Sequence, residues 1–192
     1  MGAATVYSDS ERVHDARRRY FSDNAFGDDG GYGSSWVKLK LGPIPFGLPN
    51  TAARKRAVPL HDLHHVATGY ATDWTGEGEI SAWEIASNCR HHTAAWLLNL
   101  GAFSFGLVIA PRRAYRAFIR GRHSDNLYRG EFGEGLLALS VGELRARLRL
   151  ATNEPTATLG DRVAFAFSAL VATLWGASLP AAIAVFLGVL LA

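Results

Sequence analysis

The sequence has almost no cysteine: Cys89 is the only one among its 192 residues. A single thiol cannot form an internal disulfide, so the chain does not resemble a small disulfide-stabilised secreted domain, and we expect a buried, unreactive thiol in a cytoplasmic protein. Residues 1–15 also lack the apolar core of an export signal and carry acidic residues early, so we expect no such signal.

Charge of either sign is scarce as well. Charged residues make up 19% of the chain and hydrophobic residues 48%, and the formal net charge is +3. The arginines cluster, but no cluster accompanies a nucleic-acid recognition motif. We therefore expect an anionic lipid surface, and no nucleic acid, as the partner of this mild positive charge.

Charge is missing altogether from residues 163–192. A membrane-spanning helix needs about 20 apolar residues, so we predict a membrane segment here, either one kinked helix or a hairpin broken near Gly176 and Pro180. Arginines precede the segment and no charge follows it. This asymmetry predicts a C-terminal anchor that holds the rest of the chain on the cytoplasmic side, as at a bacterial inner membrane. The alternative is a long buried core helix.

The remaining sequence predicts an all-α fold with one compact helical domain, since the length allows one medium-sized core. Residues 1–35, rich in Gly, Ser and Asp towards their end, are expected to form a flexible N-terminal segment, and the following prolines predict a short extended arm. The helical metal-binding domain is expected over 36–152. Apolar periodicity and acidic starts predict its helices: 60–70, 78–100, 102–120 and 136–150. The uncharged run 93–110 is expected to be a buried or lipid-facing core element rather than a membrane span.

His61, Asp62 and His65 lie within five positions of a predicted helix. One turn separates the two histidines, and Asp62 falls within about 100° of the same arc, so three potential ligands converge. Glu77 follows behind the loop-like stretch TGYATDWTG and is the candidate for a fourth ligand. Imidazole and carboxylate groups suit zinc, iron(II) or manganese. The pattern predicts a divalent metal site whose ligands are also the candidate catalytic residues.

Further polar side chains are expected around this site. Glu84 and His91 continue from Glu77 at intervals of seven residues and form a polar stripe in an otherwise apolar segment. We expect four residues to hydrogen-bond the ligands or support them: His64, Glu79, Glu84 and His91. The alternative is that these are ordinary solvated helix faces, which is the commoner situation for a single histidine. The solvated-face alternative is less favoured for the group, because five of the seven histidines fall in two clusters, at 61–65 and 91–92.

The spacing His61-Asp62-x-x-His65, then eleven residues, then Glu77 resembles the H-D-x-x-H-x11-E motif of the coenzyme Q (ubiquinone) biosynthesis protein-four family. The stretch PLHDLHHVATGY is similar to the family's motif helix, and SVGELRARLRL resembles its closing helix. The resemblance covers about residues 40 to 150. The NCRHH stretch at 88–92, the glycine-rich front and the apolar tail depart from the family pattern.

The resemblance implies a mostly helical, membrane-attached protein in which His61, Asp62, His65 and Glu77 bind a divalent metal, zinc or iron. It also implies oxidative removal of the ring C1 carboxylate of a prenylated hydroxybenzoate with hydroxylation at that carbon. The partners it implies are a prenylated aromatic or quinone-like lipid and other quinone-biosynthesis enzymes, and a homodimer is a further expectation.

Three other interpretations are open. His61, His64 and His65 also fit the H-x-x-H-H box of membrane di-iron desaturases and hydroxylases, although that class needs about eight histidines and several spans. A His-Asp phosphohydrolase rests on a weak dipeptide signal. The third is a non-enzymatic scaffold that binds a prenyl lipid between apolar helices, with the arginines of 111–122 at anionic headgroups.

Overall fold

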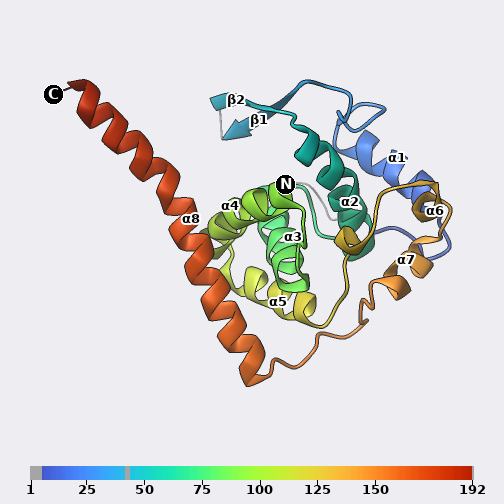
Figure 1. Ribbon diagram of the computed structural model, residues 1–192. Helices are drawn as coiled ribbons and strands as arrows, with labels where there is room; N and C mark the ends of the chain where they lie inside the picture. The colour runs from blue at the N-terminus through green and yellow to red at the C-terminus, as the bar shows by residue number, and fades with distance from the viewer. Residues whose placement is uncertain (1–5, 42–43, 192) are drawn as a thin grey trace.

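The structure is a computed structural model that describes residues 6–41 and 44–191, with side chains described except at 38–41, 44–46, 48 and 179–191 (Figure 1). Helices dominate the described residues, which confirms the all-α prediction. The elements, in chain order, are α1 Val13–Asp23, β1 Trp36–Leu41, β2 Ile44–Pro49, α2 Ala52–Thr68, α3 Trp74–Ser87, α4 Thr93–Ile109, α5 Pro111–Arg122, the 3-10 turn η1 Leu127–Arg129, α6 Glu134–Leu137, α7 Val141–Arg147 and α8 Leu159–Leu191. The predicted extended arm is the antiparallel hairpin β1–β2, in which Trp36 pairs with Pro49.

The helix predicted over 78–100 is wrong, because the chain leaves the helix after Ser87 and resumes it at Thr93. Asn88 has φ 82° and Arg90 φ 51°, so both residues turn the backbone into the left-handed region. The Asn88 side chain accepts a hydrogen bond from the Arg90 N–H at 2.8 Å. Asparagine competes with helical hydrogen bonds in this way, and a periodicity argument does not capture the competition.

The helices predicted over 102–120 and 136–150 are each divided in two. Pro111 occupies the first turn of α5, where its missing N–H costs nothing, and separates α5 from α4. Ser140 and Glu143 form a reciprocal capping box that begins α7 and separates it from α6. These signals are local and override the apolar pattern that runs across them.

Helix α1 lies within the N-terminal segment that the sequence predicts to be flexible, and sequence reasoning missed it. Its buried residues are Val13, Ala16, Tyr20 and Phe21, which recur at helical spacing. Their contacts with later elements bring part of the N-terminal segment into the core.

Cys89 is also buried, and burial raises the pKa of its thiol, as expected for an unreactive cysteine.

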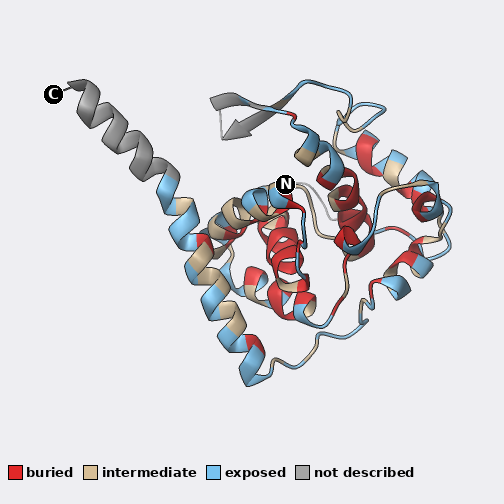
Figure 2. Cartoon of the chain, viewed as in Figure 1, coloured by how far each residue is buried: buried red, intermediate tan, exposed pale blue. Residues whose placement is uncertain are grey.

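The core is organised around α3, which packs against α4 and α5 and is buried along most of its length (Figure 2). Ile80, Ala82 and Trp83 are fully buried. Two glycines allow α3 and α4 to approach closely: a Cβ on Gly106 would lie 2.8 Å from the Gly78 Cα, too near for any real contact. The backbone of α3, which carries the acidic residues of the site, is therefore positioned by this glycine contact.

Helix α8 is one continuous helix that runs alongside α4 (Figure 1). The hairpin alternative is therefore wrong, and the Trp175 indole N–H donates to the Leu97 carbonyl at 3.0 Å across the α4–α8 contact. Phe167 and Leu174 are 68% and 63% exposed, so α8 is not the buried core helix of the other alternative. Part of the predicted membrane segment 163–192 lies outside the described side chains. Within the described part of the chain, no helix is both long enough and apolar enough to cross a membrane.

The glycine contact predicts opposite effects for two similar substitutions in α4. Gly106→Ala should lower the free energy of unfolding by about 1–3 kcal/mol, because the new methyl forces α3 and α4 apart. Gly101→Ala should raise it by about 0.5–1 kcal/mol, because nothing lies within 4 Å of the new Cβ and alanine favours the helix. Urea unfolding of the two variants checks this, and a shift in the same direction would contradict the packing argument.

Candidate metal centre

Local signals end α2 just after the histidines and begin α3 just before Glu77. Gly69 ends α2 with φ 77°, and its N–H donates to the His65 carbonyl. Asp73 begins α3 by accepting a hydrogen bond from the Gly76 N–H at 2.9 Å. A Cβ on Gly76 would lie 2.1 Å from the Ala71 carbonyl oxygen, so only glycine permits this tight return. Glu77 is thereby held in the first turn of α3, facing α2.

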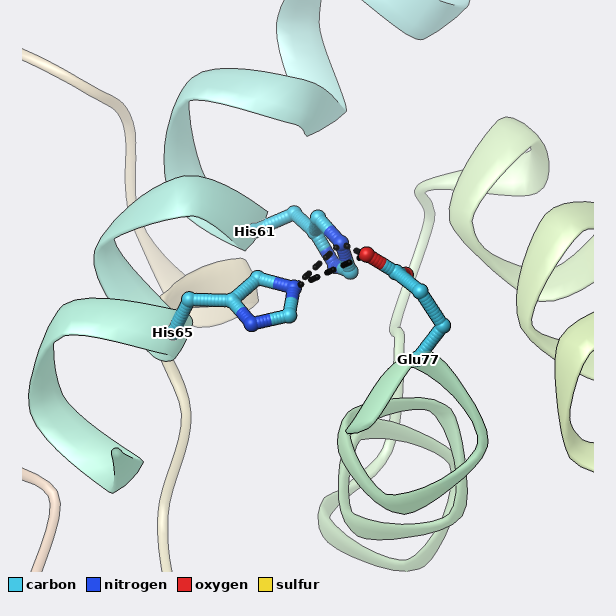
Figure 3. A group of neighbouring side chains, drawn as sticks. All are labelled: His61, His65 and Glu77. Atoms are coloured by element: carbon cyan, nitrogen blue, oxygen red, sulfur yellow. Dashed lines mark hydrogen bonds and ion pairs between the residues drawn. The ribbon is translucent and has the colours of Figure 1, made fainter. Parts of the chain in front are cut away.

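His61, His65 and Glu77 direct their side chains toward one point between α2 and α3 (Figure 3). The two Nε2 atoms are 3.1 Å apart. Glu77 Oε1 lies 3.5 Å from His65 Nε2 and Oε2 lies 3.7 Å from His61 Nε2. One ligand atom from each residue falls within 4.8 Å of the others, so the group could hold a metal ion.

The hydrogen bonds on the far side of each ring determine which nitrogen faces the site. His65 Nδ1 lies 2.9 Å from the Tyr70 carbonyl oxygen, which can only accept, so Nδ1 carries the proton. His61 Nδ1 lies 2.9 Å from Glu84 Oε1 and donates to it. In its neutral form each imidazole therefore presents the lone pair of its Nε2 to the site. The ring of Tyr20 stacks on that of His65, with centroids 5.7 Å apart, and helps to hold its plane.

A cation between these groups resolves an electrostatic conflict. Two Nε2 lone pairs and a carboxylate face one another, and only a proton or a metal ion can satisfy all three. The donor set fits zinc or iron(II), and a carboxylate or carbonyl on the other imidazole nitrogen is the usual partner of a metal-bound histidine. The side chains of His65, His61 and Glu77 are 1%, 20% and 31% exposed, so the group is closed behind His65 and open beside Glu77.

Glu84 supports the histidines from within the core, where its side chain is fully buried. Its Oε1 accepts hydrogen bonds from His61 Nδ1 at 2.9 Å and His64 Nδ1 at 2.6 Å. Its Oε2 accepts from Asn99 Nδ2 at 2.5 Å and from the Tyr128 hydroxyl at 2.9 Å. Four donors satisfy the two carboxylate oxygens, which makes a buried charge tolerable.

These contacts shift the ionisation of the site residues. Burial alone would lower the pKa of His61, but the carboxylates of Glu84 and Glu77 outweigh it and raise the pKa well above its usual value. Burial opposes ionisation of Glu77, yet His65 and His61 hold its pKa at about 2. Burial likewise opposes ionisation of Glu84, and His61 and His64 hold its pKa well below the usual range. Both glutamates are therefore anionic at neutral pH.

Asp62, a predicted ligand, is not in the three-residue group that the structure brings together. Its carboxylate accepts hydrogen bonds from the hydroxyls of Tyr20 at 3.4 Å and Tyr32 at 2.5 Å. One position along the helix rotates a side chain by about 100°, which is enough to direct Asp62 to α1. Burial raises the pKa of this carboxyl.

Of the four residues expected to support the ligands, Glu84 does so directly. His64 contacts Glu84, and its Nε2 accepts the Leu127 N–H at 2.9 Å, so its lone pair is used away from the metal group. Glu79 points to α5 and pairs with Arg113 through bonds of 2.9 and 2.6 Å. His91 is exposed and stacks on His92.

Sequence reasoning missed Tyr20, Tyr32, Tyr70, Asn99 and Tyr128. Asn99 carried a detectable signal, since it is an amide in the uncharged run 93–110. The tyrosines come from segments distant in sequence, and nothing local marks them.

The fold and site together define a helical protein with a candidate His-His-Glu metal centre. No protein-family model, curated protein or solved structure matches the chain.

Metal binding should weaken as the pH falls, because protons and metal compete for His61 Nε2. Below its raised pKa, the metal-free protein holds a proton that the metal must displace, whereas Glu77 stays ionised down to about pH 2. Calorimetric zinc titrations between about pH 6 and pH 8 should show affinity falling by about tenfold per unit of pH, with proton release. A pH-independent affinity would contradict the assigned competition.

Glu84→Gln should weaken zinc affinity by about 10–100-fold, because the amide cannot accept from both histidines or raise the basicity of His61. Tyr128→Phe is the matched control. It removes one donor to Glu84, lowers stability by about 1–3 kcal/mol, and should leave zinc affinity nearly unchanged. Competition against a chromophoric chelator measures both, and equal zinc affinities for the two variants would refute the role of Glu84.

Proposed function

We propose that His61, His65 and Glu77 bind one divalent metal ion and that this ion is the reactive centre of the protein. The observation that carries the proposal is the pair of Nε2 atoms 3.1 Å apart beside Glu77, in which each ring makes a hydrogen bond through its other nitrogen and so can offer Nε2 to a metal ion once that nitrogen is unprotonated. In the metal-free protein a proton on His61 Nε2 joins the two rings, and a metal ion would take the place of that proton and contact all three side chains. A bound metal would supply Lewis acidity and, if redox-active, oxygen chemistry.

The resemblance to the coenzyme Q protein-four family supports a substrate for this centre. We propose a prenylated hydroxybenzoate whose ring C1 loses its carboxylate and gains a hydroxyl. In the balanced reaction, the carboxyl carbon leaves as carbon dioxide and one atom of dioxygen becomes the new hydroxyl oxygen. The other oxygen atom leaves as water, with two electrons from an external nicotinamide or flavin reductant.

The chain's own residues would position the reactants. The open side beside Glu77 would admit the aromatic acid, while His65 and the stacked Tyr20 close the opposite side. Asp62, held by Tyr20 and Tyr32, would keep α1 against the site. Three protein ligands would leave coordination positions for a substrate oxygen.

A membrane location is part of the proposal. Exposed apolar residues on α8 and α4 support it, including Phe167 at 68%, Leu174 at 63% and Val108 at 78%. We propose that the chain acts on the cytoplasmic face of a bacterial inner membrane, with residues 163–192 as its C-terminal attachment. Other enzymes of quinone biosynthesis would be its partners there.

The non-enzymatic scaffold is the second candidate, and the same apolar surface favours it. The histidine-box interpretation gains no support, because His64 faces Glu84 and Leu127.

Metal content is the first test of the proposal. Protein purified in mild detergent should contain about one iron or zinc per chain by elemental mass spectrometry, and His65→Ala should lose it. Absence of metal from both proteins would refute a metal enzyme and leave the scaffold.

Glu77→Ala separates the enzyme from the scaffold. It should lower oxygen-dependent carbon dioxide release from the prenylated acid by at least about 100-fold while preserving the circular dichroism spectrum, because it removes a ligand on the exposed side. Glu131→Ala, an exposed acid in a loop outside the site, is the control and should leave turnover unchanged. Unaltered turnover in Glu77→Ala would contradict the assignment, and an unfolded variant would show that the metal is structural.

A further inference from the structure

A second candidate site lies on α5, and its lining contains none of the three candidate metal ligands. An apolar hollow of about 630 Å³ lies between α5 and α8. Leu107, Ile119 and Phe165 line it, together with Pro155 and Ala157 from the segment that leads into α8. Its volume is in the range of small-molecule sites, about 300–1,000 Å³.

A polar hollow of about 370 Å³ lies further along α5. Tyr70, Thr152 and Asn153 contribute to its lining, as do Arg113 and Arg120. Arg120 donates to the Thr68 carbonyl at 3.1 Å and lies over the Tyr70 ring, so its guanidinium is held in place.

The two hollows adjoin, because Arg116 and Glu154 line both of them. These two side chains form an ion pair at 3.7 Å in which they are 68% and 71% exposed. An exposed pair of this kind contributes little stability and can be exchanged for another partner. Together the hollows form one groove with an apolar end and a polar end, separated by a weak ion pair.

The charge of the groove is unbalanced. Its lining contains five arginines and two glutamates: Arg112, Arg113, Arg116, Arg120 and Arg162 with Glu79 and Glu154. Glu79 is engaged by Arg113 in a two-bond contact. Among the side chains that the structure describes, Arg112 and Arg162 have no acidic partner within ion-pair distance. The groove therefore offers cationic groups to an anion at the edge of an apolar hollow.

We propose that this groove binds a single-chain anionic amphiphile, with its alkyl chain between α5 and α8 and its phosphate or carboxylate at Arg116. The anionic group replaces Glu154 as the partner of Arg116. The chemistry required is one negative head on one apolar chain, whether the molecule is free in solution or taken from a membrane. The proposal does not depend on the metal centre.

The probe is dodecyl phosphate, kept monomeric below its micelle concentration and titrated into the full-length protein by calorimetry. Inorganic phosphate and the neutral dodecyl maltoside are the reference ligands. Dodecyl phosphate should bind at least about 100-fold more tightly than inorganic phosphate, because only the alkyl chain gains from the apolar hollow. It should also bind more tightly than the maltoside, which has no charge for Arg116.

Two variants in the same ion pair should act in opposite directions. Arg116→Gln should weaken dodecyl phosphate binding by about tenfold, because a charge-assisted hydrogen bond is lost. Glu154→Gln should strengthen it severalfold, because a competing carboxylate is removed. Arg147→Gln, an exposed arginine on α7 away from the groove, is the matched control and should change nothing. Probe binding should be the same with added zinc and with a chelator, so the groove can be confirmed even if the metal centre fails.

Several outcomes overturn the proposal: equal effects of Arg116→Gln and Arg147→Gln, weaker binding by Glu154→Gln, or equal affinity for the charged and neutral detergents. Vesicles of phosphatidylglycerol in phosphatidylcholine identify the source of the ligand. Displacement of bound dodecyl phosphate by these vesicles supports a membrane source, and failure to displace it supports a free amphiphile. Binding to vesicles without binding to the monomeric probe overturns the groove in favour of a flat membrane contact.

Discussion

The buried carboxylate of Glu84 is the interaction on which the rest of the site depends. It lies on α3, which is buried along most of its length, and donors from α2, α4 and η1 converge on its two oxygens. A buried anion without donors would cost several kcal/mol, so the four donors must be in place for α3 to occupy its position. One side chain thus ties together elements that lie far apart in the sequence. It also selects the tautomer of His61, because its oxygen accepts the Nδ1 proton.

The same interaction stabilises the core and orients the candidate metal group. On the core side of α2, His64 donates a hydrogen bond to the Glu84 carboxylate. His61 donates to the same carboxylate and also faces the metal group, so the negative charge of Glu84 acts on that group through His61. The tautomer of His65 is determined by a different acceptor, the backbone carbonyl of Tyr70 in the loop between α2 and α3. That loop depends on Gly69 and Gly76, so its sequence is constrained by the close return of the chain as well as by the site.

Tyr70 also relates the metal centre to the proposed amphiphile groove. Its carbonyl orients His65, and its ring contributes to the polar hollow beneath the Arg120 guanidinium. The proposed groove and the candidate metal group are therefore joined by one short loop.

Much of this protein follows from local sequence. Helical spacing places His61 and His65 on one face, and the loop-like stretch TGYATDWTG predicts a turn of the chain that brings Glu77 to the start of the next helix. The helix breaks at Asn88 and Pro111 were missed because a single residue's backbone preference outweighed the apolar pattern around it. Tertiary structure alone decided that Asp62 turns to Tyr20 and Tyr32, that Glu79 turns to Arg113, and that Glu84 receives its four donors. The physical reason is that periodicity determines which residues share a face, whereas the direction of each buried polar group depends on partners brought from distant parts of the chain.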